Sequence, residues 1–301
     1  MILSTTTRQL FSEFGYQKGI EVAKECGFDA IDIGFMRDII ENEEFSEQNY
    51  EKTCDMLLKE VKNSGLYFNQ AHAPYPSMRF RNTHETAEEY NKRIKPHIVR
   101  SIKMAGILGA KQIVVHPIDA TSRPDINQKE LNLEFFNSLV PLCREFNIKI
   151  AIENMWKYSS EFGRIVANVC SFGRELADYF DALDERYFTV CLDVGHSSLV
   201  GQHAHEAIYE LGNKRLTALH IHDNDLNNDL HTIPYFGKMD WSAIMKALAD
   251  IAYKGDFTFE VLTDSFKIGR GNKELTKKYY ELLALTGKEL IKQFEEYKNE
   301  M

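Results

Sequence analysis

The sequence lacks the features that mark several common protein classes. Its five cysteines are scattered, and no Cys-x-x-Cys pair occurs among the 301 residues. This spacing argues against both a disulfide framework and a zinc–thiolate site, and it favours reduced, buried thiols. No stretch has the roughly 18 consecutive apolar residues of a membrane span, and no basic segment followed by an apolar run opens the chain. We therefore expect a cytoplasmic protein that makes no membrane contact.

Positive charge is also scarce. With 36 Lys and Arg against 45 Asp and Glu, the formal net charge is −9, whereas proteins that bind a polyanion through charge usually present a basic surface. Nucleic acid is therefore not the expected partner. No Gly-x-Gly-x-x-Gly motif follows a predicted strand, which argues against a dinucleotide-binding fold.

Apolar segments typical of buried strands alternate with helical patterns along the chain. The predicted strands are residues 2–7, 30–35, 67–72, 112–116, 149–153, 188–192, 216–222 and 256–261. The main predicted helices are residues 16–26, 50–63, 85–108 (with Pro96 at a kink or break), 127–146, 173–183, 204–211, 241–252 and 272–301. Strict alternation gives a parallel sheet, and eight such units fit a closed barrel of about 250–300 residues. We predict an α/β protein with one domain, residues 1–301, folded as a (β/α)8 TIM barrel.

Six of the predicted strands carry a potential metal ligand at or near their C-terminal end. Function lies at that end in such barrels, and burying one of these groups unpaired is costly. Imidazoles and carboxylates without thiolates suit Mn, Mg, Zn, Co or Fe(II). We therefore predict a divalent metal cofactor, with a second and third ion left open. The six residues are His72, His116, Glu153, Asp193, His220 and Glu260.

The carboxylates of Glu153 and Glu260 form the most informative pair. They lie on the fifth and eighth predicted strands, so they would approach from different sides of the barrel mouth. Each can hold a metal through one oxygen and exchange a proton through the other, which suits proton transfer on a hydroxy-carbonyl compound. The metal would stabilise the enediolate. The alternative is that both carboxylates are only ligands, or are paired with Arg or Lys.

Further polar and aromatic residues follow the same strands. His196 lies three residues after Asp193, and period two places His220 and His222 on one strand face. Either of the added histidines could bind a ligand or simply support the fold. Other candidates for this mouth are Asp229, His231, Trp156, and, for a phosphate or carboxylate, Arg79, Arg81 and Lys157.

Together these motifs resemble the xylose-isomerase-like TIM barrel superfamily, which includes sugar-phosphate isomerases and epimerases, ketose 3-epimerases and endonuclease IV. The resemblance covers nearly the whole chain, and it implies a metal-dependent isomerase or epimerase of a sugar or sugar phosphate. A homodimer is a further expectation. The motifs are His72-Ala73-Pro74-Tyr75, His116-Pro117, Glu153-Asn154-Met155-Trp156, Asp193-Val194-Gly195-His196, His220-Ile221-His222-Asp223-Asn224, Asp229-Leu230-His231, Asp240-Trp241 and Phe259-Glu260.

Resemblance to the ketose 3-epimerases implies roles for individual residues. The expected metal ligands are Glu153, Asp193, His220 and Glu260, and the two glutamates are the expected acid–base pair. The same resemblance makes His196 a substrate contact, and from their positions at the mouth we also expect His222, His72 and Trp156 to contact the substrate. Those epimerases carry an arginine six residues beyond the ligating histidine, where this chain has Leu226.

Resemblance to endonuclease IV implies a different chemistry, phosphodiester hydrolysis at a di- or trinuclear zinc site. The acidic net charge argues against this alternative, as does Asn154-Met155-Trp156-Lys157 in place of a glycine- and threonine-rich segment. A third alternative is a catalytically silent sugar-binding barrel. The residues that match the zinc-binding positions of endonuclease IV are His72, His116, Glu153, Asp193, His196, His220, Asp229, His231 and Glu260.

Overall fold

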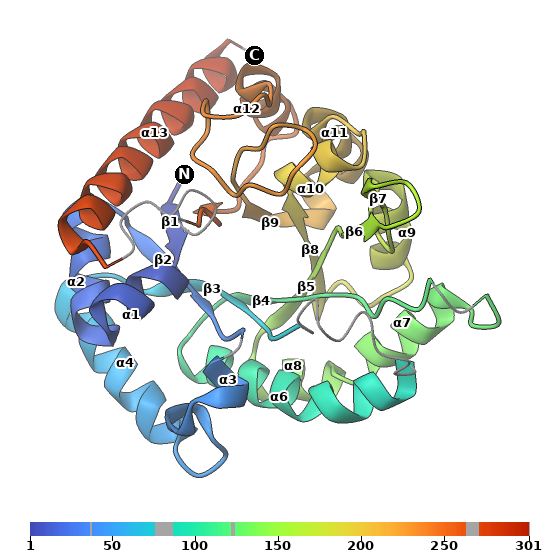
Figure 1. Cartoon of the computed structure of the whole chain (residues 1–301), viewed down its shortest axis with the longest axis horizontal. Coiled ribbons are helices and arrows are strands. Elements are labelled where there is room, and N and C mark those ends of the chain that lie inside the picture. Colours follow the sequence, from blue (N-terminus) through green and yellow to red (C-terminus); the bar gives the residue numbers. More distant parts are fainter. Residues whose placement is uncertain (37, 76–86, 122–123, 263–270, 301) are drawn as a thin grey trace.

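Eight parallel strands form a nearly closed barrel in the computed structural model, which describes residues 1–36, 38–75, 87–121, 124–262 and 271–300 (Figure 1). Their order is β10-β1-β2-β3-β4-β5-β8-β9, and a bridge between Ile221 and Phe259 joins the two edges. The predicted (β/α)8 barrel is therefore confirmed. The strands are β1 (Leu3–Thr6), β2 (Ala30–Gly34), β3 (Phe68–His72), β4 (Gln112–Val115), β5 (Lys149–Glu153), β8 (Phe188–Asp193), β9 (Leu216–His220) and β10 (Phe257–Phe259).

Helices surround the barrel and bury its outer face (Figure 1). Within the described residues, no helix combines the length and the apolar character needed to cross a membrane. The helices are α1 (Arg8–Phe14), α2 (Tyr16–Cys26), α3 (Asp38–Glu41), the 3-10 turn η1 (Glu43–Phe45), α4 (Tyr50–Ser64), α6 (Ala87–Ile107), α7 (Gln128–Asn137), α8 (Val140–Phe146), α9 (Gly173–Asp181), α10 (Val194–Leu199), α11 (Ala204–Arg215), α12 (Trp241–Asp250) and α13 (Lys273–Asn299).

Two predicted helices differ from the observed ones. The helix predicted over residues 127–146 is two helices, because α7 ends at Asn137 and α8 begins at Val140. Pro141 follows that start, and a proline fits the first turn of a helix because its missing N–H is not needed there. The helix predicted from residue 85 begins outside the described residues, and α6 continues through Pro96 without a break.

A short antiparallel hairpin between β5 and α9 was not predicted. Its strands are β6 (Trp156–Ser159) and β7 (Arg164–Ala167), paired from Trp156 with Ala167 to Ser159 with Arg164. Most of its side chains are partly or fully exposed, so the hairpin has no alternating apolar face that could have marked it in the sequence.

Small side chains fill the middle of the barrel. They are Val114, Ala151, Cys191 and Ala218, each at most 1% exposed. On each of these strands the next inward position lies two residues further on, at His116, Glu153, Asp193 and His220. This layer of small side chains therefore leaves room for large polar side chains at the C-terminal mouth of the barrel.

Helix α13 approaches the barrel closely at Gly287. A Cβ atom there would lie 2.5 Å from Leu3 Cδ1 and 2.7 Å from Phe259 Cε2, both in the buried core. Glycine therefore allows the longest helix of the described chain to pack against β1 and β10.

Gly287→Ala should lower the free energy of unfolding by about 1–3 kcal/mol through overpacking. This loss should exceed the gain of up to about 1 kcal/mol that alanine has over glycine in a helix. Urea unfolding followed by circular dichroism measures the change. Leu285→Ala is the control, since Leu285 is 57% exposed on the same helix; equal stability of Gly287→Ala and wild type would contradict the packing argument.

Candidate functional site

Three neighbouring strands bring the centre of the site together. Glu153, Asp193 and His220 end β5, β8 and β9, and the parallel register pairs Asp193 with His220 and Glu153 with Cys191. Glu260 follows β10, and its backbone N–H donates to Ile221 O at 3.0 Å. Strand pairing, with a register shift between Val190 and Cys191 where β8 meets β9, thus places these side chains at one level of the barrel.

Four of these side chains form the first group of potential metal ligands, which we call the quartet: Glu153, Asp193, His220 and Glu260. One donor atom from each lies within 4.8 Å of the others. His220 Nδ1 is 2.6 Å from Glu153 Oε1 and 3.5 Å from Glu260 Oε2. Glu153, Asp193 and His220 are fully buried, whereas Glu260 reaches the mouth.

The second group joins His72 and His116 to the other oxygen of Glu153. Glu153 Oε2 lies 2.7 Å from His116 Nε2 and 3.5 Å from His72 Nε2, and these two nitrogens are 3.2 Å apart. Despite the short contacts, Glu153 Oε2 has no hydrogen-bond donor in a suitable geometry. His72 Nδ1 donates to Ala73 O at 2.7 Å, so its Nε2 carries a lone pair. Buried lone pairs that converge in this way fit a cation.

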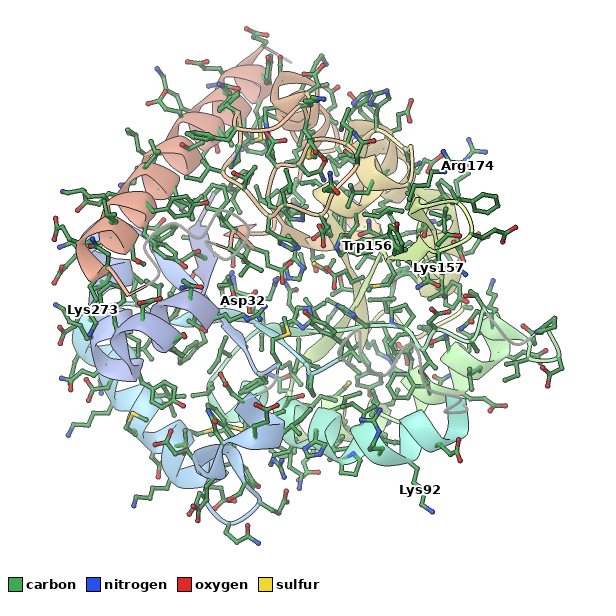
Figure 2. All side chains as sticks on the ribbon, in the orientation of Figure 1. Asp32, Lys92, Trp156, Lys157, Arg174 and Lys273 are labelled. Carbon is green, nitrogen blue, oxygen red and sulfur yellow. The ribbon has the colours of Figure 1, made fainter. Side chains whose placement is uncertain are left out.

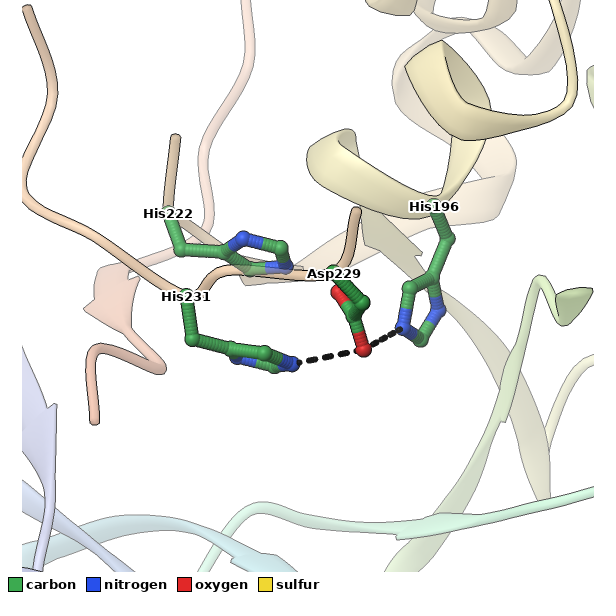
Figure 3. A group of neighbouring side chains, drawn as sticks. All are labelled: His196, His222, Asp229 and His231. Atoms are coloured by element: carbon green, nitrogen blue, oxygen red, sulfur yellow. Dashed lines mark hydrogen bonds and ion pairs between the residues drawn. The ribbon is translucent and has the colours of Figure 1, made fainter. Parts of the chain in front are cut away.

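The third group contains His196, His222, Asp229 and His231 (Figure 3). Asp229 Oδ2 lies 3.1 Å from His231 Nε2 and 3.9 Å from His196 Nε2. His196 Nδ1 donates to Asn154 O at 2.8 Å, and His231 Nδ1 donates to Glu260 O at 2.7 Å. These bonds fix the tautomers and leave both Nε2 atoms facing the shared carboxylate, an arrangement that suits metal ligation.

His222 connects the quartet to the third group. Its Nε2 lies 3.0 Å from both carboxylate oxygens of Asp193, and its ring stacks on that of His231 with centroids 3.9 Å apart. A Cβ at Gly195 would lie 2.1 Å from His222 Cε1. This close approach explains the glycine inside the Asp-x-Gly-His motif.

For Glu153 and His220 of the quartet, burial shifts the pKa in one direction and the neighbouring groups shift it in the other. Burial raises the pKa of Glu153, but its interactions with the imidazoles of His220 and His116 outweigh burial and bring that pKa well below its usual range. Burial lowers the pKa of His220, but the neighbouring groups Cys191, Glu260 and Glu153 raise it well above its usual range. The arrangement therefore favours positive charge next to the Glu153 carboxylate.

Asp32 is a site residue that the sequence analysis missed. It lies on β2, fully buried, and its Oδ2 is 3.8 Å from His220 Nε2 (Figure 2 labels Asp32). Neither Asp32 Oδ1 nor His220 Nε2 has another hydrogen-bond partner. Gln70 Nε2 donates to Asp32 Oδ2 at 3.3 Å and holds the carboxylate. A lone carboxylate inside the apolar run Ala30-Ile31-Asp32-Ile33 is the signal that could have identified it.

Two of the remaining predicted contacts, Trp156 and Lys157, lie on β6. Trp156, the first residue of β6, has its ring edge-on to that of His196 at 6.2 Å between centroids (Figure 2). Lys157 Nζ donates to Thr121 Oγ1 at 2.7 Å. Arg79 and Arg81 lie outside the described residues.

One buried carboxylate anchors the loop that carries Asp229 and His231. Asp223 Oδ1 accepts from Asn224 N at 2.8 Å and Met239 N at 3.2 Å. Asp223 Oδ2 accepts from Tyr235 N at 2.9 Å and Trp241 Nε1 at 2.8 Å. The two ends of the loop are therefore fixed to the same side chain.

Adding Mn²⁺ or Zn²⁺ to chelator-treated protein should raise Tm, because a ligand that binds only the native state stabilises it. Glu153→Gln should lose most of this gain, since Glu153 belongs to both the first and the second group. Differential scanning calorimetry and elemental analysis measure the shift and the metal content. Glu145→Gln, an exposed site on α8, is the control; a full gain in Glu153→Gln would contradict the site.

Asp32→Asn should weaken metal binding by about 10–100-fold, the usual effect of removing an outer partner of a ligating histidine. Calorimetric titration with Mn²⁺ gives the affinity. Asp256→Asn is the matched control, because Asp256 accepts from Asn69 Nδ2 at 3.2 Å and does not belong to any of the three groups. Equal affinities for the two variants would show that Asp32 does not act through His220.

Comparison with known proteins agrees with this architecture. The sequence profile of the family described as xylose isomerase-like TIM barrel matches residues 20–285. A D-psicose 3-epimerase structure from Clostridium cellulolyticum H10 shares the fold with a TM-score of 0.72 and 17% identity, over 97% of this chain and 99% of that one.

Two sequence relatives match parts of the chain. The y4fM protein of Sinorhizobium fredii is 30% identical over 177 residues, and the match covers 57% of this chain but only 53%, about half, of that relative. A protein named probable endonuclease 4 from Acholeplasma laidlawii is 23% identical over 212 residues, 64% of this chain and 67% of that one. The family match spans most of the chain, and the chain belongs to the xylose isomerase-like TIM barrel family.

Proposed function

We propose that this protein is a metal-dependent isomerase or epimerase of a sugar or sugar phosphate. The observation that carries the proposal is the approach of two carboxylates, Glu153 and Glu260, to one imidazole nitrogen, His220 Nδ1, at 2.6 and 3.5 Å. The two glutamates come from β5 and the end of β10, so a sugar at the mouth would meet them on two sides. The shared fold with a D-psicose 3-epimerase supports the same reaction class.

The quartet would hold the metal ion through nitrogen and oxygen donors, which suit Mn, Mg, Zn or Co. When bound there, a divalent ion supplies Lewis-acid polarisation of the sugar's carbonyl oxygen. The second and third groups would hold further ions if more than one is taken up.

The two glutamates would move the protons. One carboxylate takes a proton from the carbon beside the carbonyl. The electron pair of that C–H bond forms a C=C bond, and the carbonyl π pair moves onto the oxygen to give an enediolate. The other carboxylate returns a proton to the opposite face or to the neighbouring carbon. His196, whose Nδ1 is held by Asn154 O and whose Nε2 faces the mouth beside Asp229, binds a sugar hydroxyl. His72 and Trp156 limit the space around the ring and exclude water.

A second candidate function is phosphodiester hydrolysis. It is favoured by the three adjoining groups of potential ligands, which include every position matched to endonuclease IV. Two or three ions could then hold a phosphate and activate water. The net charge of −9 disfavours a nucleic-acid substrate, so we rank this function second.

Glu260→Gln should lower turnover by about 10²–10⁴-fold, because an amide cannot exchange the proton. Solvent deuterium entering the sugar, followed by proton NMR over a panel of ketoses, aldoses and their phosphates, measures the reaction. The exposed site Glu145→Gln should match wild type.

Three results would each contradict the proposal in a different way. Full turnover in Glu260→Gln would reject the proton-transfer role of that glutamate. A wild-type protein that binds sugars but exchanges no deuterium would be a silent sugar-binding barrel. Two or three zinc ions per chain together with cleavage of abasic DNA would establish the phosphodiesterase.

A further inference from the structure

A groove of about 800 Å³ adjoins the third group of potential ligands. One wall is the β6–β7 hairpin, and the other is the loop at residues 226–229 with the C-terminal end of α10 (Figure 1 shows the hairpin beside β5 and β8). Asp229 belongs to both the groove and the third group. Trp156 also lines the groove and contacts His196. The groove is therefore continuous with the site at the barrel mouth.

The loop wall of the groove is held in place by its own hydrogen bonds. Leu226 N donates to Asn224 Oδ1 at 2.9 Å, and the N–H and side-chain amide of Asn228 donate to the Asp225 carboxylate at 2.7 and 2.9 Å. Leu226 has a φ of +69°, a conformation that a leucine rarely adopts. Its side chain is 42% exposed. The fold thus holds an apolar side chain against the groove at a conformational cost, as binding sites often do.

The lining of the groove suits a carbohydrate. Tyr158, 55% exposed on β6, and the half-buried Trp156 offer aromatic faces for the C–H face of a sugar ring. Asn227 and Asn228 also line the groove; their side-chain NH2 groups donate to Asp225, and their amide oxygens can accept from sugar hydroxyls. Among the described residues that line the groove, Arg164 is the one basic side chain. A nucleic-acid backbone would require several such charges.

The size of the groove indicates a substrate larger than one sugar. Its volume lies in the range of pockets that enclose drug-sized ligands, about 300–1,000 Å³. A single hexose bound beside the quartet would leave this groove unfilled. We propose that the substrate is a reducing disaccharide, whose reducing unit lies at the quartet and whose glycosyl unit lies in the groove. This inference rests on the proposed isomerase or epimerase function and specifies its substrate class.

Tyr158→Ala tests the inference in the Mn²⁺-loaded full chain. We expect solvent deuterium to enter the reducing unit of cellobiose, maltulose or lactulose with a lower KM than for glucose or fructose. The variant should raise KM for the disaccharide about tenfold and leave KM for the monosaccharide unchanged. Tyr67→Ala is the matched control, since Tyr67 is 40% exposed and precedes β3 at the other end of the barrel.

Binding of inert analogues provides a second readout. Maltitol has no carbonyl and cannot react, so the difference between the calorimetric affinities for maltitol and for sorbitol measures the contribution of the groove. We expect tighter binding of maltitol by wild type and by Tyr67→Ala, and a loss of that preference in Tyr158→Ala.

Two results would overturn the inference, and they are distinguishable. Deuterium exchange into monosaccharides, with no preference for disaccharides and no effect of Tyr158→Ala, would reject the groove and leave the proposed function in place. Deuterium exchange into no sugar of either class would reject the proposed function, and this inference with it.

Discussion

The buried carboxylate of Glu153 is the group on which the site depends. Its two oxygens face different partners, His220 at 2.6 Å and His116 at 2.7 Å, and burying such a charge without partners would be costly. Imidazoles must therefore reach it from several strands, and the small side chains of Ala151 and Cys191 one layer below give them room. The parallel register of β5, β8 and β9 then places Asp193 beside His220.

The buried strands and the polar residues at their C-terminal ends could be predicted from the sequence, because each depends on a local pattern of residues. An apolar run ending in Asp193 or Glu153 predicts both a buried strand and a polar tip. Features that depend on contacts between distant residues were missed. Asp32 gains its place in the site only through His220, which is 188 residues away in the sequence (220 − 32). The hairpin β6–β7 also gave no signal, since its side chains are mostly exposed.

The potential ligands suit both of the chemistries proposed for this protein. The same donors suit one ion beside a proton-transfer pair or several ions around a phosphate. The residues that surround the potential ligands distinguish the two chemistries better than the ligands do. The described residues that line the groove include Leu226, Tyr158 and one basic residue, Arg164, and the chain is acidic overall. Walls of this kind complement hydroxyls and ring faces more than they complement phosphates.

The loop after β9 is anchored at its two ends and not at its tip. Asp223 fixes both ends of the loop through four hydrogen bonds, and none of them involves residues 226–228. Substitutions at the tip can therefore alter what the groove accepts while Asp229 and His231 keep their positions. A lineage could change its substrate by point mutation without first losing its donor groups.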